Sequence, residues 1–186
     1  MKLRTDVADI SSGGLREVSA FTIKASAQAF SILSSGLYSN KIQAIIRELS
    51  CNAADSHIAA GKASVPFDVH LPNHIEPFFA VRDYGTGLCH DDVMNLYTSY
   101  FSSTKNQSNE FTGALGLGSK SPFCYTGNFS VMSIFAGVQR VYTAFIDETG
   151  CPNIALMLEV PTTEDNGIEV KFSVDNMREF TTFQVE

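Results

Sequence analysis

IRELSCNAADSH, residues 46–57, combines helical apolar spacing with three polar side chains that burial alone does not require. Apolar residues recur at helical spacing over residues 40–60, so we expect one helix here, capped by Asn40 and stopped by Gly61. The apolar positions are Ile42, Ile45, Ile46, Leu49 and Ala53.

The three polar residues of this helix share one face. At about 100° per residue, Asn52 lies about 40° from Glu48, and Asp55 lies about 20° to the other side. The apolar residues sit between about 60° and 160° from Glu48, so the polar stripe follows the edge of the buried face. A pocket wall would lie there, although a solvated helix face is the commoner cause of such a stripe.

The composition indicates one globular domain. The chain has 186 residues, 44% of them hydrophobic and 18% charged, which is enough to bury one core. No run approaches the roughly 18 apolar residues of a membrane span, and no signal-peptide pattern is evident, so we expect a soluble, intracellular protein. A net charge of −7 argues against nucleic-acid binding but does not exclude a nucleotide. The four cysteines are far apart, which favours reduced thiols over a zinc site or disulfides.

The remaining pattern places helices mainly first and strands mainly last. We expect short helices after Ser26, at Asp91 and over residues 119–125, and a strand candidate near Phe21. The other expected strands cover residues 67–71, 78–82, 129–135, 141–146, 154–160 and 168–174. This order predicts an α+β fold with a mostly antiparallel sheet.

A carboxylate and two glycines follow the expected strand at residues 78–82. Asp83, Gly85 and Gly87 form the pattern D-x-G-x-G. Glycines let a backbone turn sharply and approach a flat ligand, and a carboxylate in an apolar pocket accepts a hydrogen bond from an exocyclic amine. Taken alone, an ordinary Asp-Gly turn explains the pattern equally well.

GALGLGSKSP, residues 113–122, is a glycine-rich segment that runs into a helix start. It is not a P-loop, because Ser119 separates the last glycine from Lys120. Free N–H groups at a helix start attract an anion, and a phosphate would relieve the conflict between Lys120 and the helix dipole. The preceding polar stretch, residues 99–117, has the length of a lid or binding loop.

E-x-x-x-N-A-x-D, D-x-G-x-G and G-x-x-G-x-G in this order resemble the GHKL ATPases: gyrase B subunits, large heat-shock chaperones, histidine kinases and MutL proteins. Three longer runs are similar to the rIIA-like (rapid-lysis) proteins of tailed bacteriophages. They are FSILSSGLYSNKI (30–42), SYFSSTK (99–105) and GLGSKSPFCYT (116–126). The resemblance implies a Bergerat fold, a two-layer α/β sandwich with a mixed, mostly antiparallel sheet. It also implies a single ATP-binding domain over residues 1–186, with an N-terminal extension (1–25) and a mobile ATP lid (99–118).

The resemblance assigns roles to individual residues. Glu48 matches the general base that polarises the attacking water, and Asn52 matches the ligand of a Mg²⁺ ion that bridges the phosphates. Asp83 matches the carboxylate that binds the adenine amino group, and Asp55 matches a position that steadies this end of the pocket. The other matches are Gly85 and Gly87 at the base, and Lys105, Gly113, Gly116, Gly118 and Lys120 at the phosphates.

Two departures from the family pattern set the expected activity. Ile168 stands where many members have a threonine that holds adenine through water, so adenine binding is expected to be weaker or differently arranged. The gyrase and MutL branches bring a lysine to the γ-phosphate from a following domain, and this chain stops at Glu186. The chain would then be an isolated N-terminal domain or a short relative, a weak ATPase that binds ATP with slow hydrolysis to ADP and phosphate, or with none.

The implied function is Mg-dependent ATP binding that closes the lid and drives association, in a phage protein for lysis inhibition or for protection from host or prophage exclusion. The alternative is a non-catalytic, ATP-dependent switch or binding module that engages a host protein. The implied partners are ATP or ADP, a second copy, or a phage or host protein, with no nucleic acid. The expected location is the host cytoplasm, or the periphery of the inner membrane for a longer protein. A histidine kinase is a weaker interpretation, because no phosphoacceptor-histidine helix precedes the domain.

Overall fold

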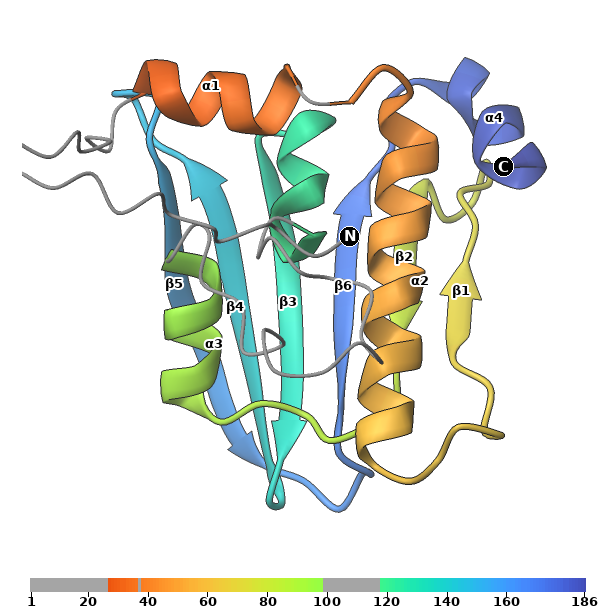
Figure 1. Ribbon diagram of the computed structural model, residues 1–186, viewed down its shortest axis with the longest axis vertical. Coiled ribbons are helices and arrows are strands. Elements are labelled where there is room, and N and C mark those ends of the chain that lie inside the picture. The colour runs from red at the N-terminus through yellow and green to blue at the C-terminus, as the bar shows by residue number, and fades with distance from the viewer. Residues whose placement is uncertain (1–26, 37, 99–117) are drawn as a thin grey trace, which may run out of the picture.

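The computed structural model describes residues 27–36, 38–98 and 118–186, which form two layers. One layer is a six-stranded sheet in the order β1-β2-β6-β3-β4-β5 (Figure 1). The strands are β1 (Asp68–His70), β2 (Phe78–Arg82), β3 (Asn128–Phe135), β4 (Val138–Ile146), β5 (Pro152–Pro161) and β6 (Gly167–Ser173).

The sheet corrects one expectation, because all five strand pairings in the described part of the chain are antiparallel. The expected mixed sheet was wrong, whereas the α+β class and the mostly antiparallel character are confirmed. Strands β3, β4 and β5 follow one another as hairpins, and β6 then returns to pair between β2 and β3. This return carries the start of β6 to the end of β2, where Asp83 follows.

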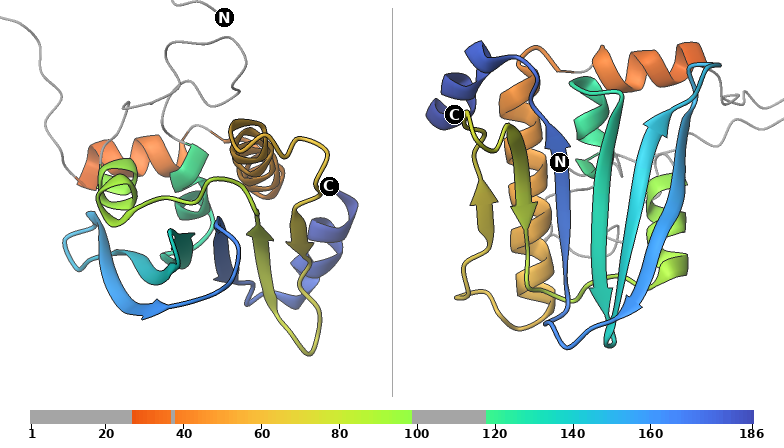
Figure 2. Two further views of the ribbon diagram at one scale, coloured as in Figure 1. Left: turned by 90° about the horizontal axis from the view of Figure 1, so that it is seen from below. Right: turned by 180° about the vertical axis from the view of Figure 1, so that it is seen from behind.

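The second layer consists of helices on one side of the sheet (Figure 2, left). They are α1 (Ala27–Ser35), α2 (Lys41–Ala59), α3 (His90–Thr98) and the 3₁₀ helix η1 (Gly118–Cys124). Two further helices end the chain beside α2 and β1, η2 (Met177–Glu179) and α4 (Phe180–Val185). The sequence patterns did not predict η2 and α4. No helix in the described part of the chain is long and apolar enough to cross a membrane.

Helix α2 forms where local signals predicted it. The Asn40 side chain accepts a hydrogen bond from the Gln43 N–H at 3.1 Å, and Gly61 takes a left-handed φ of 69° just after the helix. Ile45, Leu49 and Ala53 are buried in the core. Each large apolar side chain contributes roughly 1.5–3 kcal/mol when fully buried, so this face anchors α2 on the sheet.

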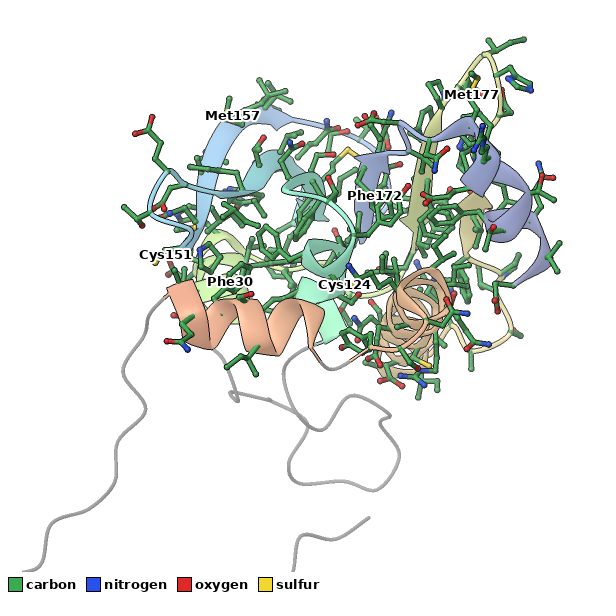
Figure 3. All side chains as sticks on the ribbon, turned by 90° about the horizontal axis from the view of Figure 1, so that it is seen from above. Phe30, Cys124, Cys151, Met157, Phe172 and Met177 are labelled. Carbon is green, nitrogen blue, oxygen red and sulfur yellow. The ribbon has the colours of Figure 1, made fainter. Side chains whose placement is uncertain are left out.

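Aromatic side chains pack η1 between α1 and the sheet. The Phe123 ring lies edge-on to Phe30, with centroids 5.4 Å apart, and to Phe129, with centroids 4.8 Å apart. Figure 3 shows Phe30 and Cys124 directed into the interior between the two layers. A helix was expected over residues 119–125, and the structure gives it 3₁₀ geometry, consistent with Pro122, which lacks the N–H that an α-helical hydrogen bond would need.

Candidate functional site

Helix α2 and the start of η1 bring the first and third sequence motifs together. A Cβ atom added to Gly118 would lie 2.7 Å from Glu48 Oε2 and 3.6 Å from Asn52 Nδ2. Gly118 therefore packs directly against the two polar side chains of α2. A side chain at this position would have to displace the Glu48 carboxylate, which is the flexible end of a side chain.

Glu48 and Asn52 lie one turn apart on α2 and remain accessible to solvent. The Glu48 side chain is 22% exposed, and its Oε1 receives a hydrogen bond from the Arg47 guanidinium at 2.9 Å. Asn52 is half-buried, and of its atoms the amide nitrogen lies nearest to a Cβ on Gly118. A carboxylate and an amide group therefore lie side by side next to Gly118.

Asp83 lies in a buried loop after β2, only 6% exposed. Its Oδ1 accepts hydrogen bonds from Ser56 Oγ at 3.0 Å and from the Gly85 N–H at 2.9 Å, and its own N–H donates to Ile168 O at 2.8 Å. Burial raises the pKa of this carboxyl above its ordinary value. Oδ2 has no hydrogen-bond partner among the described residues, so one oxygen of a buried carboxylate is left to accept a donor.

Three glycines let the Asp83 loop pack closely against its neighbours. A Cβ on Gly85 would lie 2.5 Å from the Ser56 carbonyl carbon, and one on Gly87 would lie 2.0 Å from Ile134 O. A Cβ on Gly167, at the start of β6, would lie 2.0 Å from Asp83 O. Gly85 and Gly87 thus have a packing reason of their own, whether or not they also border a ligand.

The first turn of η1 buries polar groups. Lys120 is 4% exposed and its Nζ donates to Leu96 O in α3 at 2.6 Å, and burial lowers the pKa of its ammonium group to about 8. Ser119 and Ser121 are buried, and within the described ranges neither hydroxyl has a hydrogen-bond partner. Buried polar groups of this kind are costly unless something else satisfies them.

Several predicted site residues cannot be placed. Lys105, Gly113 and Gly116 lie outside the described residues, as does the expected lid apart from Gly118. Asp55 is buried in α2 at 4% exposure. The hydrogen bond from α2 to the Asp83 carboxylate comes from the next residue, Ser56.

Sequence reasoning missed both Ser56 and His57. The His57 side chain is buried, only 1% exposed. Its Nε2 accepts the Tyr84 N–H at 2.8 Å, and its Nδ1 lies 2.8 Å from Val65 O. The position of His57 around the helix could have indicated this burial, because the residue lies only about 20° beyond Ile46, at the edge of the apolar face.

No protein-family model and no curated protein matches this chain.

Proposed function

We propose that this chain binds Mg-ATP in the manner of the GHKL ATPases, with slow hydrolysis or none. The observation that carries the proposal is the meeting of the three motifs around α2: Gly118 lies against Glu48 and Asn52, and Ser56 is bonded to Asp83. Residues 48 to 56 span eight helical steps, or about 12 Å along the axis. That spacing suits a nucleotide with its base at one end and its phosphates at the other.

The Asp83 loop would hold the base. Asp83 Oδ1 is occupied by Ser56 and Gly85, which fixes the carboxylate plane and leaves Oδ2 for the adenine amino group. Because the carboxylate is buried, a missing donor is costly, and this favours a purine that carries an amine. Ile168 contributes its backbone oxygen to the Asp83 N–H and offers no hydroxyl to a water, in keeping with weaker adenine binding.

The start of η1 would face the phosphates. The Ser119 and Ser121 hydroxyls lack partners in the described structure, and the Lys120 ammonium group is held in a site that disfavours its charge. An anion would satisfy donors of this kind and stabilise the charged lysine. These are the residue types that a phosphate site requires.

The residues present also fit a magnesium ion. No cluster of three or more His, Cys, Asp or Glu side chains suited to a metal occurs among the described residues. Mg²⁺ bound with a nucleotide needs few protein ligands, since phosphate and water oxygens supply the rest. Asn52 would provide one amide oxygen, and the ion would neutralise charge that develops on the phosphates. Glu48, one turn away, would orient and deprotonate the attacking water.

The biological role that we propose rests on the resemblance to the rIIA-like phage proteins: ATP binding drives association with a second copy or with a phage or host protein in the host cytoplasm, in lysis control or exclusion. The second candidate is a switch that binds ATP without turnover. The Arg47 ion pair on the Glu48 carboxylate favours it, because the pair occupies one of the two oxygens that would otherwise orient the attacking water.

Calorimetric titration tests the proposal directly. We expect ATP, ADP and a non-hydrolysable ATP analogue to bind with Mg²⁺, and the triphosphates to bind more weakly after chelation of the metal. A folded chain that gives no binding heat with any of the three nucleotides would overturn the proposal.

A further inference from the structure

The last turn of α2 holds the Asp83 loop through two consecutive side chains. Ser56 Oγ donates to Asp83 Oδ1 at 3.0 Å and accepts the Thr86 N–H at 3.2 Å. His57 Nε2 accepts the Tyr84 N–H at 2.8 Å. The Asp83 side chain and the backbone N–H groups of Tyr84 and Thr86 are therefore tied to one helical turn.

These contacts define the roles of the two ring nitrogens of His57. Nε2 accepts the Tyr84 N–H, whereas Nδ1 faces the Val65 carbonyl oxygen and donates to it. The Tyr84 N–H therefore depends on an acceptor at the position of Nε2.

The charged groups around His57 and its partner Tyr84 come from the loop after β2, the loop after α2 and strand β1. Asp83 interacts electrostatically with the imidazole, and Lys62, after α2, donates from Nζ to Tyr84 O at 2.9 Å. Asp68 in β1 accepts the Tyr84 hydroxyl at 2.6 Å. The Phe67 and Tyr84 rings cover the imidazole, with centroids 6.3 and 6.5 Å away. Tyr84 is thus held at its N–H, its carbonyl and its hydroxyl, and only the His57 bond depends on an imidazole.

We propose that His57 is a positioning residue for base recognition, whose Nε2 holds the Tyr84 backbone and so aims the neighbouring Asp83 carboxylate. The inference rests on the proposed nucleotide function and deepens it. Preference for a 6-amino purine then depends on a hydrogen-bond acceptor at the position of His57 Nε2. A purine triphosphate with oxygen at position 6, inosine triphosphate, is the matched competitor because it differs at the group that Asp83 would contact.

Two uncharged replacements separate positioning from packing. In His57→Gln, the amide oxygen reaches the place of Nε2 and accepts the Tyr84 N–H at every pH. In His57→Asn, the shorter amide reaches only the place of Nδ1, so the Tyr84 N–H loses its acceptor. The two side chains are both polar and uncharged, which makes each the control for the other.

The experiment measures the Kd of the full chain for ATP and for inosine triphosphate, with Mg²⁺, at pH 8. We expect His57→Gln to keep the wild-type preference for ATP, because its amide oxygen accepts the Tyr84 N–H in place of Nε2. His57→Asn should lose about tenfold in preference, the equivalent of one hydrogen bond.

Loss of the wild-type ATP preference in His57→Gln would overturn the inference, as would equal ATP preference in the Gln and Asn variants. If His57→Asn does not fold, the comparison of wild type with His57→Gln decides alone. These failures differ from failure of the proposed function, in which wild type binds neither triphosphate at pH 8.

Discussion

Two buried ionisable side chains, Asp83 and Lys120, occupy opposite ends of the candidate site and respond to pH in opposite ways. Burial raises the pKa of the Asp83 carboxyl and lowers the pKa of the Lys120 ammonium group to about 8. In both cases the fold favours the neutral form. A bound nucleotide would favour the charged forms. Charging these buried groups costs desolvation free energy, which lowers the stability of the folded protein.

Replacement of the carboxylate tests the adenine end. The folded-state pKa of Asp83 lies above its unfolded value, so its contribution to stability is complete below the unfolded pKa and is lost as the pH rises through the folded pKa. We expect Asp83→Asn to unfold at a temperature no lower than wild type at pH 7 while losing ATP binding at least tenfold. Thermal denaturation with calorimetric titration measures both, and a clear loss of stability would contradict this view of Asp83.

Lys120 tests the phosphate end. Its folded-state pKa of about 8 lies below its unfolded value, so its cost to stability is absent above the unfolded pKa and complete below pH 8. With a pKa of about 8, Lys120 is about half protonated at pH 8, so we expect ATP binding to take up about half a proton because a phosphate stabilises the ammonium form. Titration in buffers of different ionisation heat measures the uptake. Lys120→Met should abolish this uptake. Equal uptake in that variant would show that a group other than Lys120 binds the proton.

At the scale of elements, α2 contacts both η1 and the loop after β2, the described segments that contribute to the site with it. Its middle meets η1 at Gly118, and its last turn meets the loop after β2 at Gly85. The two contacts differ in kind, because Gly118 faces the tip of the Glu48 side chain whereas Gly85 faces the backbone of Ser56. A side chain tip can move aside at little cost, and helix backbone cannot.

The contact of Gly85 with helix backbone predicts that an alanine at this position lowers the stability of the fold. Gly85→Ala should destabilise the fold by roughly 1–3 kcal/mol, since its Cβ would lie 2.5 Å from the Ser56 carbonyl carbon. Gly127→Ala is the matched control, because a Cβ there meets nothing within 4 Å, and it should change stability by less than about 0.5 kcal/mol. Urea denaturation compares them, and equal effects would refute the contact.

Gly118→Ala should act on chemistry and not on the fold. Its Cβ would displace the Glu48 carboxylate, and stability should change by less than about 0.5 kcal/mol. Any hydrolysis by wild type should fall in Gly118→Ala as it does in Glu48→Ala. A steady-state phosphate-release assay measures this, and full activity in Gly118→Ala would show that Glu48 does not act from this position.

At the scale of the whole molecule, a single six-stranded sheet and its helical layer hold the candidate site on one side. Strand β6 returns to the middle of the sheet beside β2, and this places Gly167 and Ile168 against Asp83. The Asp83 end of the site therefore joins segments that are 84 residues apart along the chain, the separation of Asp83 and Gly167.

The distinction between an ATPase and an ATP switch also belongs to this scale, because the proposed turnover depends on groups assembled from the whole fold. Glu48→Ala should leave the Kd for Mg-ATP within about twofold and abolish hydrolysis, since a general base acts on the reaction and not on ground-state binding. Binding and phosphate release are measured on the same preparation. Wild type with no turnover supports the switch, and rapid turnover would contradict the expectation of slow hydrolysis.

Local signals in the chain were enough to place most elements. Asn40, Gly61 and helical apolar spacing predicted α2 nearly to the residue, and the apolar run of β2 was predicted to the residue, because caps and periodicity act between near neighbours. The patterns E-x-x-x-N-A-x-D and D-x-G-x-G identified Glu48, Asn52 and Asp83 as candidate site residues. Helix α4 escaped prediction because it is six residues long and is held by packing of Phe183 on Phe79 and Phe172.

Contacts between distant segments lie beyond such signals. The spacing of α2 could not show that Ser56 and His57 would meet the loop at Asp83, because their partners are 27 residues away and arrive through β1 and β2. The pairing of β6 between β2 and β3 likewise depends on how the strands pack, which made every described pairing antiparallel. Short-range patterns encode each helix and strand, whereas burial, hydrogen-bond partners and pKa values arise only when remote segments exclude water together.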